Sequence, residues 1–84
     1  MNRTKRIGNI LQKNLPDFSI NVIDNSHLHK GHNNFDGLLE THIAILLKKK
    51  TKIQISRLEI HKIINSLLKE EFNKGLHSLE IRIN

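Results

Sequence analysis

Histidine is the residue type most able to do chemistry in this chain, because its 84 residues include six histidines and no cysteine. Disulfides and thiolate metal sites are therefore excluded from the chain's own atoms, and any metal chemistry must use imidazole or carboxylate groups. Three histidines cluster and three stand apart: His27, His29 and His32, then His42, His61 and His77. A short His-rich tract binds Zn²⁺ or Cu²⁺ readily, but it can equally be a polar loop whose histidines only titrate.

Basic residues are the second feature that can do chemistry. Fourteen Lys and Arg against eight Asp and Glu give a formal net charge of +6. This excess attracts nucleic acid, phosphorylated ligands or acidic protein surfaces without selecting among them. The run over residues 48–52 is typical of a solvated turn, although with Arg57 and Lys62 it can also form a patch for DNA phosphates.

Sequence-specific recognition of nucleic acid is not favoured. The chain has no Gly-x-x-Gly clamp, and its three aromatic residues are all Phe, which leaves few platforms for base stacking. Electrostatic binding of DNA stays as the alternative function, carried by Lys48, Lys49, Lys50, Lys52, Arg57, His61 and Lys62.

The first half of the chain contains the elements that must position the clustered histidines. Apolar residues at helical spacing predict an amphipathic helix over residues 2–14, which Pro16 ends. Alternation then predicts a half-buried strand over residues 18–22. No periodicity survives over residues 27–39, which predicts a loop long enough to be functional.

The second half begins with a strand over residues 41–47, whose weak alternation predicts cover on both faces. Ser56 and Glu59 have the spacing of a capping box and predict the start of the main helix, which ends near Asn73. Gly75 offers a left-handed stop.

The last apolar alternation predicts a strand over residues 79–83, with His77 in phase with its apolar face. From the residues alone, the favoured interpretation of His77 is therefore a histidine packed at the edge of a sheet. The order helix, two strands, helix, strand predicts one α+β domain over residues 1–84, a three-stranded sheet backed by helices.

Two classes of protein are not expected. The longest apolar run, residues 43–47, is far shorter than the ~20 residues of a membrane span, and the N-terminus has no apolar signal core, so we expect a cytoplasmic protein. Ser26, Ser56 and the histidines form no nucleophile pattern and no phosphate loop is present, so an enzyme is not expected.

An ordered set of motifs carries a resemblance to a known family. They are Asp24-x-Ser26, Glu40-Thr41-His42, His61, Leu68-x-Glu70-Glu71 and Leu76-His77-Ser78-Leu79. In this order and spacing they resemble the "D-x-S…E-T-H", "L-x-E-E" and "hydrophobic-H-A-L" stretches of BolA-like proteins, over roughly residues 2–83.

The resemblance implies an αββααβ arrangement similar to a class II KH domain, with an extra short helix over Ile53–Leu58. It implies no catalysis. It also implies pairing with a monothiol glutaredoxin, with which such proteins share a bridging [2Fe–2S] cluster supported by glutathione, in iron trafficking. Some members are described as DNA-binding regulators.

The resemblance also implies a pair of metal ligands. His77 matches the family's C-terminal histidine ligand, and His29 is the first choice for the loop ligand, with His27 and His32 as alternatives. Neutral imidazole can replace thiolate on one iron of a [2Fe–2S] cluster. His42 is interpreted as structural, hydrogen-bonded to nearby backbone.

Two departures from the family concern the basic surface. Ile60-His61-Lys62 stands where the family usually has Arg-His-Arg, and residues 48–54 lack the Phe and Gly of the usual "V-S-x-x-F-x-G". Both weaken a DNA-binding role and leave His29 and His77 unaffected.

Overall fold

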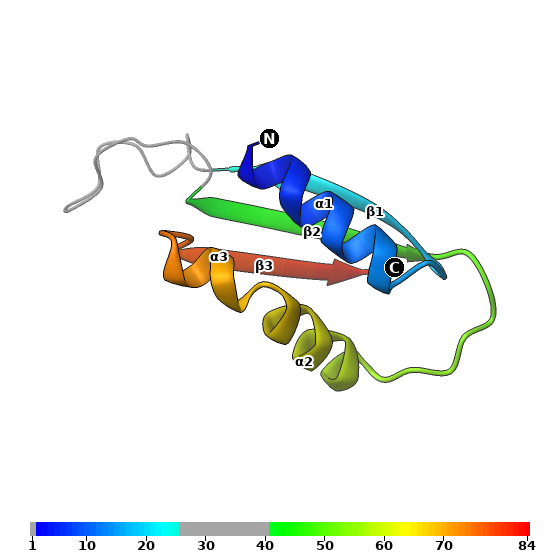
Figure 1. Cartoon of the computed structure of the whole chain (residues 1–84). Helices are drawn as coiled ribbons and strands as arrows, with labels where there is room; N and C mark the ends of the chain where they lie inside the picture. The colour runs from blue at the N-terminus through cyan, green and yellow to red at the C-terminus, as the bar shows by residue number, and fades with distance from the viewer. Residues whose placement is uncertain (1, 26–40) are drawn as a thin grey trace.

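The structure is a computed structural model in which residues 2–25 and 41–84 are described. The elements follow in the order αββααβ (Figure 1). Their bounds are α1 Arg3–Asn14, β1 Phe18–Asp24, β2 His42–Lys49, α2 Arg57–Leu67, α3 Lys69–Asn73 and β3 Ser78–Ile83. This arrangement confirms the predicted α+β fold.

The three strands form one mixed sheet in the order β1-β2-β3. The central strand β2 is antiparallel to β1 and parallel to β3, and Ile45 pairs with Val22 on one side and Ile81 on the other. Because β2 and β3 are parallel, the chain needs a long crossover between them, which α2 and α3 provide. The helices lie along the sheet in Figure 1.

The core lies between the helices and β2. Its fully buried large side chains are Phe18, Ile7, Leu11, Ile45, Leu47, Ile60, Ile64 and Leu68. Each such side chain contributes about 1.5–3 kcal/mol relative to an exposed one. The predicted cover of β2 on both faces was wrong: Ala44 is buried, but His42 and Leu46 on the same face are only half-buried, and its strand partners Ile23 and Glu80 are exposed.

Three local predictions are confirmed, two of them at the ends of helices and one in a strand. The Ser56 hydroxyl accepts a hydrogen bond from the backbone N–H of Glu59 at 3.1 Å, which is one half of the predicted capping box. Gly75 has φ 115°, the left-handed stop expected after the last helical turn. The half-buried alternation of β1 is also present.

The placement of the helices in the second half of the chain was wrong in two respects. The expected single helix is divided at Leu68, which has φ −101° and ψ 12°, into α2 and α3. Residues 53–56, expected in a short helix, are in neither helix nor strand. The reason is tertiary: Ile53 and Ile55 alternate with exposed neighbours and pack against the core, which an extended segment allows.

Residues 2–25 and 41–84 contain no helix that is both long and apolar enough to cross a membrane.

Candidate functional site

His77 lies directly before β3, and its side chain is exposed. Its backbone N–H donates to the carbonyl of Thr41 at 2.8 Å, and the N–H of Ser78 donates to the same carbonyl at 3.1 Å. Thr41, directly before β2, and the start of β3 are therefore held together. The imidazole is presented to solvent at that end of the sheet rather than packed into its edge.

His42 is the nearest imidazole to His77 among the described residues. The centroids of the two rings are 5.8 Å apart, with an angle of 76° between the ring planes. The ring of His42 is half-buried, and its Nδ1 lies 3.0 Å from the Thr41 hydroxyl. One partner of the His42 ring is therefore the side-chain hydroxyl of Thr41.

The predicted loop ligands His27, His29 and His32 lie outside the described residues. The described residues on either side of that segment do lie near His77. The N–H of Asn25 donates to the carbonyl of His42 at 2.8 Å, and Thr41 binds the backbone of His77. Asn25 and Thr41, the described residues that flank the segment, therefore both lie at the end of the sheet that carries His77.

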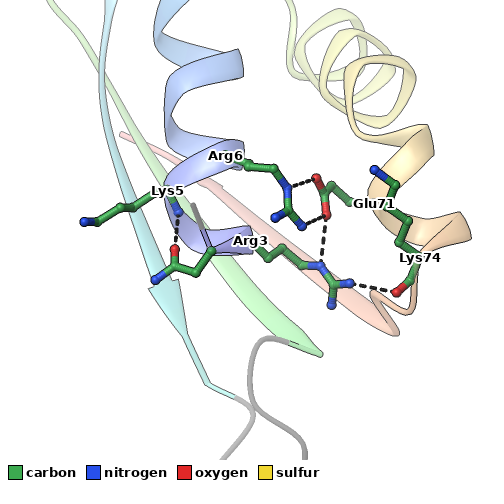
Figure 2. A network of polar contacts seen from close by, with 6 residues as sticks. Arg3, Lys5, Arg6, Glu71 and Lys74 are labelled. Atoms are coloured by element: carbon green, nitrogen blue, oxygen red, sulfur yellow. Dashed lines mark hydrogen bonds and ion pairs between the residues drawn. The ribbon is translucent and has the colours of Figure 1, made fainter.

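A buried ion-pair network lies next to this end of the sheet. Glu71 in α3 is 4% exposed, and its carboxylate receives hydrogen bonds from Arg3 at 3.0 Å and from Arg6 at 2.9 Å. Arg3 also donates through Nη2 to the carbonyl of Lys74 at 2.8 Å. Figure 2 shows both arginines reaching from α1 to α3.

The arginines keep Glu71 ionised. Hydrogen bonding from Arg6, followed by hydrogen bonding from Arg3 and the charges of both, lowers the pKa of Glu71 to about 2, although burial acts in the opposite direction. The network joins α1 to the segment that leads from α3 to His77. Sequence reasoning missed it because the paired side chains are up to 68 residues apart in the chain.

The residues proposed for DNA binding lie at and after the other end of β2 and on the first part of α2. Lys48 and Lys49 close the strand, which starts at His42 near His77. At a rise of about 3.3 Å per residue, the two ends of β2 are about 23 Å apart. The side chains of this basic surface are all exposed: Lys48, Lys49, Lys50, Lys52, Arg57, His61 and Lys62.

Within residues 2–25 and 41–84, no group of three or more His, Cys, Asp or Glu side chains is arranged to hold a metal ion. In this part of the chain the rings of His77 and His42 lie beside each other at one end of the sheet.

Comparison with known proteins agrees with this architecture. The model of the family described as "BolA-like protein" matches residues 11–84. This chain belongs to the BolA-like family. The match covers both histidines of the described site and confirms the resemblance seen in the motifs.

Three relatives show how widely this BolA-like sequence is shared. The "Uncharacterized protein in cobS 5'region" of Sinorhizobium sp is 40% identical over 63 residues, covering 74% of this chain and 68% of the relative. "Protein BOLA1, chloroplastic" of Arabidopsis thaliana is 33% identical over 95% of this chain, which spans 51% of that protein. "UV-induced protein uvi31" of Schizosaccharomyces pombe is 32% identical, and the match covers 96% of this chain and 82% of that protein.

Two solved structures share the fold of this BolA-like protein. The BolA domain of SufE1 from Arabidopsis thaliana has a TM-score of 0.79, and BolA1 from the same plant has a TM-score of 0.80. Each is 31% identical to this chain, and each match covers 100% of this chain and 92% of the other.

Proposed function

We propose that this BolA-like protein is a non-enzymatic partner of a monothiol glutaredoxin. In that complex it supplies imidazole ligands to a bridging [2Fe–2S] cluster shared with the glutaredoxin and glutathione. The observation that carries the proposal is the exposure of His77 at the end of the sheet where Asn25 and Thr41, the described residues on either side of the histidine-rich segment, also lie. His77 is one ligand, and His29 is the first choice for the other, with His27 and His32 as alternatives.

The donor set of this chain suits such a shared cluster. A chain without cysteine can offer only imidazole or carboxylate groups, and imidazole replaces thiolate on one iron of Rieske-type clusters. The described residues contain no group of three ligands, and the proposal takes His77 and a loop histidine from this chain and the remaining ligands from the glutaredoxin and glutathione. His77, an exposed donor at the end of the sheet, is accessible to such a partner protein.

The length of chain between the described residues and the loop histidines also supports the pairing. Asn25 is hydrogen-bonded to the first residue of β2, beside His77. His29 follows Asn25 by four residues, which reach at most about 14 Å when extended. A cluster held by His77 is therefore within the span available to His29.

The test is co-expression of the chain with a monothiol glutaredoxin, followed by visible absorption spectroscopy of the purified heterodimer. We expect a coloured complex whose absorption is lost or strongly altered in His77→Ala. His61→Ala is the matched control, because His61 is also exposed but lies on α2, and it should leave the spectrum unchanged. A cluster spectrum that is indifferent to His77→Ala contradicts the proposal.

Electrostatic binding of DNA is a second candidate function, favoured by one observation. The seven side chains of the basic surface are all exposed, and they lie around the end of β2 and the first two turns of α2. A mobility shift on DNA at two salt concentrations, without iron, tests it. Binding that is tight and sequence-dependent at physiological salt favours a regulator, whereas binding lost as salt rises indicates phosphate contacts alone.

A further inference from the structure

The two imidazoles of His42 and His77 are brought together by strand pairing rather than by chain proximity. His42 is opposite Ser78 in the parallel register of β2 and β3, and the backbone of His77 is bonded to the residue before His42. The backbone therefore fixes the two Cα atoms on neighbouring strands. The rings meet edge to face, with centroids 5.8 Å apart.

We propose that His42 and His77 together bind one divalent transition-metal ion, with Zn²⁺ as the first choice, in the absence of any glutaredoxin. Imidazole is a preferred donor for Zn²⁺, Cu²⁺ and Ni²⁺, and a four-coordinate Zn²⁺ accepts water or a partner's ligand in its remaining positions. The site differs from the proposed cluster site in taking its second ligand from β2 instead of the loop.

The separation of the rings suits one shared ion. With Zn–N bonds of about 2.0–2.1 Å and tetrahedral coordination, the centroids of two imidazoles on one Zn²⁺ lie about 5 Å apart. The observed 5.8 Å requires the rings to approach by less than about 1 Å. His77 must also rotate out of the edge-to-face arrangement, which its exposed position permits.

Thr41 supplies the outer contact that metal-binding histidines usually have. When the Nδ1–H of His42 donates to the Thr41 hydroxyl, the lone pair of the ring is on Nε2, the nitrogen that binds the ion. The same residue holds the backbone of His77 through its carbonyl. Thr41 is 6% exposed, so its position is fixed by packing. One buried residue thus orients both ligands.

The consequence for the proposed function is competition. Both sites use His77, so a Zn²⁺ ion on His42 and His77 and a cluster on His77 exclude each other. The inference shares that residue with the proposed function, but its test needs neither a partner nor a cluster.

The first experiment follows the histidine ring nitrogens of the full chain by long-range ¹H–¹⁵N NMR during titration with Zn²⁺ alone at pH 7.5. To remove binding by the loop, the titrated protein carries His27→Asn, His29→Asn and His32→Asn. We expect one nitrogen of His42 and one of His77 to shift together, saturating at one ion per chain, while His61 does not shift. A shift confined to one of the two rings, or equal shifts in all three, overturns the proposal.

The second experiment measures Zn²⁺ affinity by calorimetry in variants of the same background. We expect His42→Asn and His77→Asn each to weaken binding by about tenfold or more, with the double variant no weaker than the weaker single one. Thr41→Val should cost about tenfold, and His61→Asn is the control expected to cost nothing. Unchanged affinity in His42→Asn overturns the two-imidazole site. Failure of the glutaredoxin complex in the separate cluster experiment does not affect this outcome.

Discussion

The exposed histidines His61 and His77 show how the surroundings of a residue decide its chemical use. Both rings are open to solvent, but His61 lies on the outer side of a helix. His77 has its backbone bound to Thr41 and a second imidazole beside it. Of these two histidines, His77 is the one with a described imidazole beside it, which is why we propose it as a ligand and use His61 as the control.

A prediction at this scale concerns the choice among the loop histidines. In the complex with a monothiol glutaredoxin, we expect His29→Ala to change the visible spectrum as strongly as His77→Ala, because loss of either ligand leaves an iron with an incomplete ligand set. His27→Ala and His32→Ala should keep the spectrum of the unmodified protein. If His27→Ala or His32→Ala abolishes the colour while His29→Ala retains it, the loop ligand has been assigned to the wrong residue.

Among the elements, α3 is placed by charge as well as by packing. Its buried carboxylate, Glu71, is the point where Arg3 and Arg6 of α1 converge (Figure 2). Removing one partner of a buried ion pair is costly because the remaining charges lose their counter-charge. We expect Glu71→Gln to lower the free energy of unfolding by about 2–3 kcal/mol, measured with denaturant at pH 7.

The control for this change is its exposed neighbour on the same helix. Glu70→Gln should alter the free energy of unfolding by no more than about 0.5 kcal/mol. Equal effects of the two substitutions contradict a specific role for the Glu71 network.

The same network predicts a pH dependence of stability. The pKa of Glu71 is about 2 in the folded chain, against an ordinary value of 4.5 for a glutamate carboxyl, so between these pH values the unfolded chain binds more protons. The contribution of Glu71 is therefore complete above pH 4.5 and is lost as pH falls towards 2. It amounts to about 3 kcal/mol, since one pKa unit corresponds to about 1.4 kcal/mol.

Measuring the free energy of unfolding from pH 7 to pH 2 in the unmodified chain and in Glu71→Gln isolates this contribution. The difference between the two proteins should shrink as the pH falls, because all other carboxylates are common to both. A difference that is constant over this range contradicts the pKa assigned to Glu71.

Two glycines, Gly8 within α1 and Gly75 in the turn after α3, are expected to respond to substitution by alanine with opposite changes in stability. Gly75→Ala should destabilise the chain by about 1–2 kcal/mol, because φ 115° is unfavourable for a residue with a Cβ. The added Cβ lies 3.7 Å from Arg3 Nη2, an ordinary contact, so the backbone is the source of the cost. Gly8→Ala, within α1 and 3.8 Å from Val22, should stabilise by about 0.5–1 kcal/mol. Thermal unfolding of both variants measures these effects, and stabilisation by Gly75→Ala contradicts the left-handed stop.

The whole molecule has its two chemically distinct surfaces at opposite ends of β2. His42 begins β2 and His77 lies directly before β3, whereas the basic surface lies at and after the end of β2 and on the first part of α2. A separation of about 23 Å exceeds the Debye length of about 8 Å at physiological ionic strength, so charges at one end have little effect on the other.

This separation predicts that the two candidate functions can be removed independently. Replacing Lys48, Lys49, Lys50 and Lys52 with Gln should weaken any DNA binding and reduce its salt dependence, while leaving metal binding at His77 unchanged. His77→Ala should have the reverse effect. Mobility shifts and metal titrations on both variants provide the measurement, and loss of both activities in either variant contradicts two separate surfaces.

The sequence by itself determined the features that depend on near neighbours. The first helix, the alternation of β1, the cap at Ser56 and the stop at Gly75 each follow from side chains within a few residues of one another. The ordered motifs also identified the family. Periodicity and capping depend on residues that are close together in the chain, so they can be recognised from the sequence alone.

Only the tertiary structure decided which distant groups meet. The break at Leu68 and the extended path of Ile53 and Ile55 follow from packing against the core. The contact of Glu71 with α1 depends on how the helices dock on the sheet. The approach of His42 to His77 depends on the parallel pairing of β2 with β3, which a sequence pattern does not specify because pairing partners are set by the folded sheet.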